Sequence, residues 1–253
     1  MKYMGSKSRI KKHILPILQH YIDTFNIELY VEPFVGGVNV IEDIKCKSRV
    51  GSDISLPLIA LFKELAKGYI PPETVPKEFY DDVRANRNTD KYPQHVLGAV
   101  GFLASYNGRY FDGGYARPTV KDGVVKRDYY QESKRNIMKQ VPKIKDITFF
   151  HCSYEQYKHT KDALVYCDIP YKDTKGYDTS KNFDYEHFDK WAEEIANDNI
   201  VILSEINPLS DNWVCIWEQE VLRSIKSKDK SRAVEKLFIH KNSLKFKGGT
   251  DNA

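Results

Sequence analysis

The four residues Asp168-Ile-Pro-Tyr171 have the clearest chemical potential in this chain, because they follow the apolar run Leu164–Cys167. Such a run is typical of a buried parallel strand. The proline favours an extended conformation at the residue before it, which would fix the direction of that residue's carbonyl. The Asp168 carboxylate and this carbonyl could then accept hydrogen bonds from one exocyclic amino group, while the tyrosine ring stacks on a flat base. A strand that simply enters a proline turn is the alternative interpretation of these four letters.

A second strand-like run, Leu29–Val31, leads into Glu32-Pro-Phe-Val-Gly-Gly37. Glycines at the end of a strand let the backbone approach a ligand closely. The spacing is not G-x-G-x-x-G, so it does not predict a pyrophosphate site for a dinucleotide. The acidic Glu32 at the strand tip suits a cationic ligand instead, and a tight turn without a ligand is the alternative.

Asp53 follows a third short strand, Arg49–Ser52, and lies sixteen residues after Gly37. In nucleotide-binding α/β folds an acid at this place accepts hydrogen bonds from ribose hydroxyls. The same aspartate could instead cap a helix that begins near Pro57. Open α/β sheets bind ligands beyond the carboxyl ends of their strands, so these motifs together predict a nucleotide-like cofactor and a flat substrate at one sheet edge.

The periodicity of apolar residues predicts an α/β fold with a mostly parallel sheet and an antiparallel hairpin at its end. We expect helices at 10–22, 38–44, 57–65, 130–141 and 185–196. We expect strands at 29–31, 49–52, 147–150, 163–167, 200–206, 213–217, 221–225 and 234–240.

Residues 71–145 differ from the flanking sequence and predict an insertion between two parts of one catalytic domain, 1–70 and 146–253. Long apolar runs become fewer there, and turn residues become frequent. Residues 106–145 contain ten Lys or Arg against four Asp or Glu, whereas the whole chain has a net charge of +4. The excess positive charge therefore belongs to the insertion, as expected for a region that contacts a polyanion.

Several other classes of protein are not supported. The four cysteines (Cys46, Cys152, Cys167 and Cys215) are scattered, which predicts reduced, buried thiols rather than a disulfide framework. The seven histidines show no metal-ligand spacing with them, and a P-loop is absent. No apolar segment approaches the roughly 20 residues that cross a membrane, and no secretory signal is visible, so we expect a cytoplasmic protein without metal.

The order of the motifs resembles the Dam-like (D12) class of adenine-N6 DNA methyltransferases, in particular the compact phage-borne forms. Lys2-Tyr-Met-Gly-Ser-Lys7 is similar to the K-W-x-G-G-K element of that class, and Val31–Gly37 to its F-V-E-P-F-x-G cofactor loop. Ser52-Asp-Ile54 is similar to the ribose-binding motif, and Asp168–Tyr171 stands in the place of D-P-P-Y. The likeness spans nearly the whole chain.

The resemblance implies a Rossmann-like sheet that binds S-adenosyl-L-methionine, with 71–145 as an inserted target recognition domain for double-stranded DNA. It places around the cofactor Tyr3, Lys7, Glu32, Phe34, Gly36, Gly37, Asp53, Ile54, Ser153, Tyr154 and Asp168. Lys7 could meet the methionine carboxylate or support the catalytic strand. Candidates for DNA contact are Lys2, Tyr106, Asn107, Arg109 and Arg117. The basic segment 226–232 is either a further phosphate contact or a solvated hairpin tip.

The implied mechanism is direct methyl transfer to N6 of an adenine flipped out of the duplex. Tyr171 would stack on the base, and Asp168 with the Ile169 carbonyl would bind the amino hydrogens. Pro170 would hold that carbonyl in place, so positioning is the main catalytic device. The chain departs from the family at Ile169, where a first proline is usual. Isoleucine keeps the carbonyl, so we expect activity with some loss of rigidity.

Two other functions fit the same sequence. The fold and cofactor would also serve an enzyme that acts on RNA or on N4 of cytosine. A DNA-binding relative without activity is the other, and Ile169 is its only support. The sequence does not specify the recognition site. It also does not separate protection of phage DNA from a restriction pair or regulation in the bacterial host.

Overall fold

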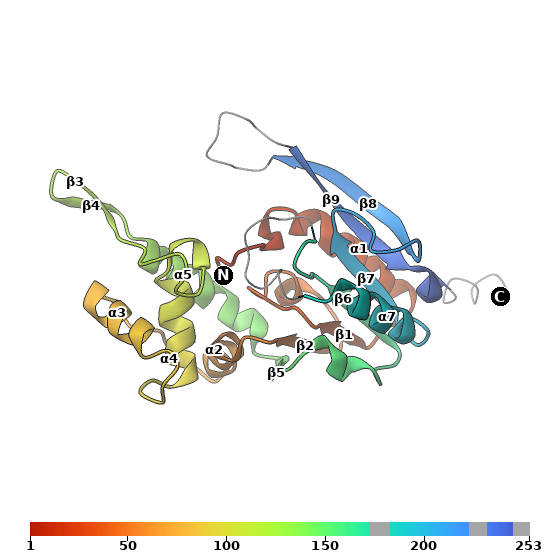
Figure 1. The fold of residues 1–253 in the computed structure, drawn as a ribbon, viewed down its shortest axis with the longest axis horizontal. Coiled ribbons are helices and arrows are strands. Elements are labelled where there is room, and N and C mark those ends of the chain that lie inside the picture. Colours follow the sequence, from red (N-terminus) through yellow and green to blue (C-terminus); the bar gives the residue numbers. More distant parts are fainter. Residues whose placement is uncertain (173–182, 223–231, 245–253) are drawn as a thin grey trace. The chain divides into compact units, whose positions relative to one another are not determined.

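The computed structural model describes residues 1–172, 183–222 and 232–244 (Figure 1). The chain forms two compact units. The first unit consists of Met1–Leu15, Val35–Ile44 and Val50–Cys152, and the second of Pro16–Phe34, Lys45–Arg49 and Ser153–Ala253. Each unit is described by itself below.

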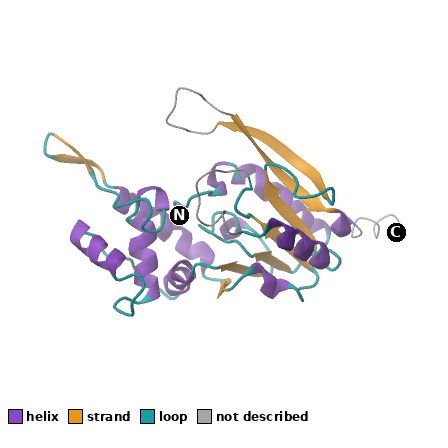
Figure 2. Ribbon diagram, viewed as in Figure 1, coloured by secondary structure: helices purple, strands orange, loops and turns teal. Residues whose placement is uncertain are grey.

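The strands of the main sheet are orange in Figure 2. In the described part of the chain this sheet has seven strands, in the order β5-β2-β1-β6-β7-β9-β8. The strands are β1 (Leu29–Glu32), β2 (Ser48–Asp53), β5 (Ile147–His151), β6 (Ala163–Cys167), β7 (Ile200–Glu205), β8 (Trp213–Leu222) and β9 (Arg232–His240). β6 pairs in parallel with β1 and β7, whereas β9 pairs antiparallel with β7 and β8. The predicted fold class, a mostly parallel sheet with an antiparallel hairpin, is confirmed.

The centre of the second unit is the strand β6, in which all five side chains are buried. Its sequence Ala-Leu-Val-Tyr-Cys has no polar alternation, as expected for a strand with both faces covered. Tyr166 lies opposite Ile202 and Cys167 opposite Leu203 in the parallel register. The residues that follow both strands therefore emerge at one edge of the sheet. The helices α1 (Lys11–Thr24) and α7 (Tyr185–Ile195) are amphipathic, and α7 buries Phe188 and Trp191.

Helices dominate the first unit. The α-helices are α2 (Leu56–Ala66), α3 (Lys77–Ala85), α4 (Gln94–Gly98) and α5 (Tyr129–Ile144), of which α3 and α4 were not predicted from the sequence. A π-helical turn, Ala99–Leu103, continues α4. Gly98 lets α4 approach α2, because a Cβ atom at this position would lie 2.2 Å from the Pro57 carbonyl oxygen. α3 and α4 are too short for a clear periodic signal, which is why the sequence did not reveal them.

A two-stranded ribbon of β3 (Thr119–Lys121) and β4 (Val124–Arg127) stands out from the helices of the first unit (Figure 1). Asp122 and Gly123 join the strands with φ angles of 53° and 71°. Positive φ at both central residues is typical of the tight hairpin turn that Asp-Gly favours. The sequence pattern was too short for a prediction here.

Three expectations need correction. The helix predicted at 38–44 is wrong, because only the 3₁₀ turn Ile41–Asp43 forms and Val38 has a φ of 56°, which no α-helix accommodates. The two strands predicted at 213–217 and 221–225 are not separate, because β8 runs without a break from Trp213 to Leu222. Residues 223–231 lie outside the described residues. All four cysteines are free thiols, but Cys167 alone is buried, while Cys215 is exposed. The strand β8 is the last of the sheet, so side chains on it reach solvent.

The contact at Gly98 gives a stability test. Gly98→Ala would gain about 1 kcal/mol of helix propensity. The added methyl would meet the backbone of Pro57, however, and overpacking costs typically 1–3 kcal/mol or more. Because backbone atoms cannot rotate away, we expect a cost of about 2–3 kcal/mol, and therefore a net loss of about 1–2 kcal/mol in the free energy of unfolding, measured by urea denaturation. Gln94→Ala in the first turn of the same helix is the control and should stay within about 0.5 kcal/mol; equal stability of both variants would contradict the packing.

Candidate active site

Three side chains of the second unit hold the segment Asp168–Lys172 after β6. The Tyr185 hydroxyl donates to the Pro170 carbonyl over 2.9 Å. The Tyr171 hydroxyl donates to the Glu235 carboxylate, and the Lys172 backbone N–H donates to Glu205 Oε2 over 3.3 Å. The carbonyl, the ring and the backbone of this segment are therefore each fixed by a different element.

Glu205 was missed by the sequence analysis. It ends β7, is only 2% exposed, and accepts the Ile206 N–H at Oε1 over 2.7 Å as well as the Lys172 N–H at Oε2. A buried carboxylate is tolerated where its oxygens accept hydrogen bonds. The signal was present, because Glu205 terminates an apolar strand in the same way as Asp168 does.

The predicted catalytic residues lie beside a buried, low-dielectric strand end. Ile169 is only 3% exposed, whereas Asp168, Pro170 and Tyr171 are partly exposed. Burial raises the pKa of Tyr166 well above its ordinary value, and the negative charge of Asp168 raises it further. Tyr166 therefore stays protonated, and the carboxylate that follows it lies at the boundary of the hydrophobic core.

Glu32 ends β1 in the same unit and is buried. Its Oε1 accepts a hydrogen bond from the Tyr30 hydroxyl over 3.2 Å. Burial and then the charge of Glu32 raise the pKa of Tyr30 well above its ordinary value. The strands β1 and β7 flank β6 in the sheet. Each of these three parallel strands has an acidic residue at its carboxyl end: Glu32 at β1, Asp168 after β6 and Glu205 at β7.

Phe34 and Tyr154 meet in an aromatic cluster of the second unit. Their rings are stacked, with centroids 5.5 Å apart, and both rings contact Phe188 edge-on. The Tyr154 hydroxyl lies 2.8 Å from His187 Nδ1, and burial raises the pKa of Tyr154 to about 12. Phe34 is partly exposed, so this cluster offers an aromatic surface next to β1.

In the first unit, the Asp53 carboxylate organises the glycine loop. Oδ2 accepts the Gly36 N–H over 3.2 Å, and Oδ1 accepts the Ser55 N–H over 2.9 Å. Burial raises the pKa of Asp53 even though both hydrogen bonds act in the opposite direction. Gly36 has a φ of 45°, and a Cβ atom there would lie 2.9 Å from Tyr3 Cε1, so a side chain has no room.

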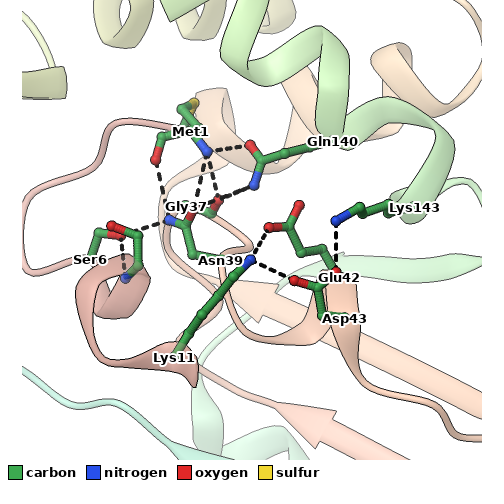
Figure 3. Close-up of polar contacts among 10 residues, drawn as sticks. Met1, Ser6, Lys11, Gly37, Asn39, Glu42, Asp43, Gln140 and Lys143 are labelled. Atoms are coloured by element: carbon green, nitrogen blue, oxygen red, sulfur yellow. Dashed lines mark hydrogen bonds and ion pairs between the residues drawn. The ribbon is translucent and has the colours of Figure 1, made fainter. Parts of the chain in front are cut away.

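Figure 3 shows how polar contacts join this loop to α5. The Gln140 side chain donates to the Gly37 carbonyl over 3.3 Å, and Asn39 Nδ2 donates to Ser6 Oγ over 2.8 Å. The Met1 amine faces the oxygens of Gly37, Asn39 and Gln140. Burial lowers the pKa of this amine to about 5.

The remaining predicted cofactor residues have varied surroundings. Ile54 is 70% exposed, and its carbonyl lies 3.0 Å from His151 Nε2. Lys7 is buried in the 3₁₀ turn of the N-terminal segment. Ser153 caps the 3₁₀ turn Tyr154–Tyr157 with its hydroxyl. Ile54 thus exposes its apolar side chain to solvent, whereas the Ser153 hydroxyl already accepts a hydrogen bond within the turn.

The predicted DNA contacts group in the first unit. Gly108 lies against Lys2, since a Cβ atom at Gly108 would be 2.2 Å from the Lys2 carbonyl oxygen. Tyr106 and Asn107, just before this contact, are exposed, and Asn107 has a φ of 56°. The other two are arginines: Arg109 forms an ion pair with Asp112, and Arg117 is exposed.

Comparison with known families and proteins gives one match. The family model described as D12 class N6 adenine-specific DNA methyltransferase matches residues 3–201. No curated protein matches the chain significantly. Over residues 1–172, 183–222 and 232–244, no cluster of three or more His, Cys, Asp or Glu could hold a metal ion. None of the helices in this described portion has the length and apolar character needed to span a bilayer.

The Glu205 contacts predict a measurable role in ordering the segment after β6. Glu205→Gln would place an amide NH₂ opposite one of two backbone N–H groups. A buried donor without an acceptor costs about 1–3 kcal/mol, so we expect a loss of that order in the free energy of unfolding. Hydrogen exchange at Lys172 or Ile206 should also become about tenfold faster. Glu218→Gln on the exposed part of β8 is the control, and identical stability and exchange in both variants would contradict the role.

Proposed function

Because the chain belongs to the family of D12 class N6 adenine-specific DNA methyltransferases, we propose that it transfers the methyl group of S-adenosyl-L-methionine to N6 of an adenine flipped out of double-stranded DNA. The observation that supports this most directly is the anchored segment Asp168–Tyr171 at the end of β6. A flipped base must be held rigidly for transfer, and this segment is fixed from three sides.

The side chains proposed for the cofactor site fit S-adenosyl-L-methionine chemically. The methyl donor combines a cationic sulfonium and ammonium with a ribose diol and a flat adenine. Asp53, in the first unit, suits ribose hydroxyls, and the exposed Ile54 suits an adenine face. Glu32 and Asp168, in the second unit, suit cationic groups. When bound, the donor supplies an electrophilic methyl group.

The proposed cofactor residues are those expected from the family. In the first unit they are Tyr3, Lys7, Gly36, Gly37, Asp53 and Ile54. In the second unit they are Glu32, Phe34, Ser153, Tyr154 and Asp168. Lys7 is suited to the methionine carboxylate because a buried ammonium group favours an anionic neighbour.

The residues after β6 would act by orientation. The N6 lone pair of adenine is delocalised into the ring and is a poor nucleophile. The Asp168 carboxylate and the Ile169 carbonyl would accept hydrogen bonds from the two amino hydrogens and so direct the lone pair out of the ring plane. N6 would release one of these hydrogens as a proton as the bond from nitrogen to the methyl group forms and the bond from sulfur to that group breaks. Pro170 would keep that carbonyl extended. Tyr171, whose hydroxyl is held by Glu235, would present its ring face to the base.

We propose that residues 71–145 form the target recognition domain, with Lys2 beside it. The basic charge of this part of the chain favours phosphate contact. Tyr106, Asn107, Arg109 and Arg117 would supply base or backbone contacts, and arginine can read guanine with two hydrogen bonds. Arg109 would have to leave or share Asp112 to do so.

Labelled S-adenosyl-L-methionine and unmethylated DNA test the function. After digestion to nucleosides, we expect label in N6-methyladenine. Asp168→Ala should lower this activity by at least a thousandfold, because the amino group loses its main acceptor. The dissociation constant of the donor should change only a few-fold, because Asp168 is one of eleven residues proposed around the donor. Asp146→Ala, at an exposed site before β5, is the matched control. Full activity of Asp168→Ala, or label in another base, would refute the assignment.

Asp53 provides a separate test of the donor site. Asp53→Asn would turn one carboxylate oxygen into an NH₂ group facing the N–H of Gly36 or Ser55. We expect the dissociation constant of S-adenosyl-L-methionine to rise at least tenfold in calorimetry, since a hydrogen bond to a charged group contributes about 1.5–3 kcal/mol. Asp90→Asn, at an exposed position, should bind normally. Unchanged binding in both variants would remove Asp53 from the site.

A further inference from the structure

The side chain of Tyr171 is held at its far end by the antiparallel hairpin of the sheet. Its hydroxyl donates a hydrogen bond to the Glu235 carboxylate on β9. In the pairing of β9 with β7, Lys236 lies opposite Glu205, the last residue of β7, so Glu235 lies just beyond the end of that strand. The carboxylate is therefore carried to the edge of the sheet at which Asp168–Lys172 emerges.

The backbone before Tyr171 is held separately by α7. The Tyr185 hydroxyl donates to the Pro170 carbonyl over 2.9 Å. That carbonyl belongs to the peptide unit that joins Pro170 to Tyr171, and a peptide unit is planar. The hydrogen bond from α7 therefore fixes the plane from which the Tyr171 side chain starts.

Tyr185 is itself ordered by two neighbours. Its ring contacts the Phe183 ring edge-on, with centroids 5.0 Å apart, and Lys172 Nζ lies 5.8 Å from its centroid. Phe183 in turn lies 5.8 Å from the Phe34 ring and 5.9 Å from the Tyr154 ring, measured between centroids. All these residues belong to the second unit. A row of ring contacts thus joins the aromatic cluster proposed for the donor to the segment after β6.

The two hydrogen bonds constrain the direction of the Tyr171 ring face. With the backbone plane and the hydroxyl both fixed, the side chain has only one χ1 setting. A phenolic O–H prefers the plane of its ring, so an acceptor in a fixed place also sets the direction of that plane. Stacking on a base depends on this direction, and a misplacement of about 1 Å in a reacting complex can cost about a hundredfold in rate.

We propose that Glu235 and Tyr185 are positioning residues for the base. Glu235 sets the face of the Tyr171 ring, and Tyr185 fixes the peptide unit from which this ring starts. Neither is among the residues proposed to contact the base or the donor, so both act through Tyr171. The inference rests on the proposed function, since it takes a flipped adenine as the base on which Tyr171 stacks.

A double-mutant cycle tests the contact at the hydroxyl. Tyr171→Phe keeps the ring and removes the hydroxyl, whereas Glu235→Ala removes the acceptor. Each variant should lower kcat by about tenfold, the order expected for a hydrogen bond to a charged group. The double variant should be no slower than the slower single variant, because both changes remove the same contact. Effects that multiply to about a hundredfold would show that the two side chains act separately, and would overturn the role of Glu235.

The conservative variant Glu235→Gln should rescue the reaction. It keeps an oxygen that accepts the Tyr171 hydroxyl, so kcat should stay within about threefold of the unmodified protein. Glu218→Ala is the matched control, because it removes an exposed carboxylate, paired with Lys236, from the neighbouring strand β8. A loss in Glu235→Gln as large as in Glu235→Ala would contradict positioning through the hydroxyl. Should Glu235→Ala fail to fold by circular dichroism, Glu235→Met replaces it in the cycle.

Tyr185→Phe tests the contact at the backbone. The variant keeps the ring contacts with Phe183 and Lys172 and loses only the hydroxyl. We expect kcat to fall by about threefold to tenfold, as for a hydrogen bond between neutral groups. The dissociation constants of donor and DNA should stay within about twofold, because the hydroxyl contacts neither. Tyr21→Phe on α1, whose ring stacks on Phe25, is the control, and an unchanged kcat in Tyr185→Phe would remove this residue from the inference.

A fluorescent base gives a readout that does not depend on methyl transfer. 2-Aminopurine replaces the adenine that the unmodified protein methylates, and its fluorescence rises when it leaves the base stack. At saturating protein, Glu235→Ala and Tyr185→Phe should give a smaller rise than the unmodified protein, because the flipped base loses a well-placed ring. Glu235→Gln should restore the rise. A full rise in both Glu235→Ala and Tyr185→Phe would contradict the positioning role.

The outcomes separate this inference from the proposed function. If the unmodified protein transfers no methyl group to adenine in duplex DNA, the proposed function and the positioning roles fail together. If it does transfer the methyl group, but the variants of Glu235 and Tyr185 keep full kcat and full fluorescence, the positioning roles alone are overturned.

Discussion

The parallel pairing of β6 with β1 and β7 is the constraint on which the candidate active site of the second unit depends. All five side chains of β6 are buried, and the strand has one parallel register that aligns Ala163 with Leu29 of β1 and Cys167 with Leu203 of β7. That register makes Glu32, Asp168 and Glu205 emerge at the same edge. Acidic groups at such an edge are costly unless they accept hydrogen bonds, and Glu205 meets this requirement through backbone N–H groups.

The surroundings of Ile169 supply part of the order that the family's usual proline would give at this position. Proline would limit the backbone directly, whereas isoleucine gains its order from burial, and Ile169 is nearly inaccessible to solvent. The neighbouring residues are held by Tyr185, Glu235 and Glu205. Side-chain contacts from α7, β9 and β7 therefore replace part of the rigidity that a second proline would provide. The segment after β6 is therefore anchored by side chains of three elements, although it contains a single proline.

The elements with long apolar patterns could be predicted from the sequence, whereas the local geometry could not. β6 and α7 match their predicted ranges closely because burial alone determines them. The helix expected after Gly37 fails because Val38 takes a left-handed φ, and the two glycines before it lie close to Tyr3 and Asn39, contacts that the sequence pattern does not reveal. Glu205 could have been noticed as an acid at the end of an apolar strand, but its contact with Lys172, like that of Glu235 with Tyr171, joins residues more than thirty positions apart and could not be predicted.

The first unit combines the glycine loop with the basic insertion in one compact body. Gln140 on α5 donates to the Gly37 carbonyl, and Lys2 touches both Gly108 and Glu132. α5 begins directly after β4, so the ribbon and the loop are attached to opposite ends of one helix. A rigid helix transmits a displacement at one end to the other. Because coupling between two ligands is reciprocal, any effect of DNA on the affinity for the proposed methyl donor would be matched by an equal effect of that donor on the affinity for DNA.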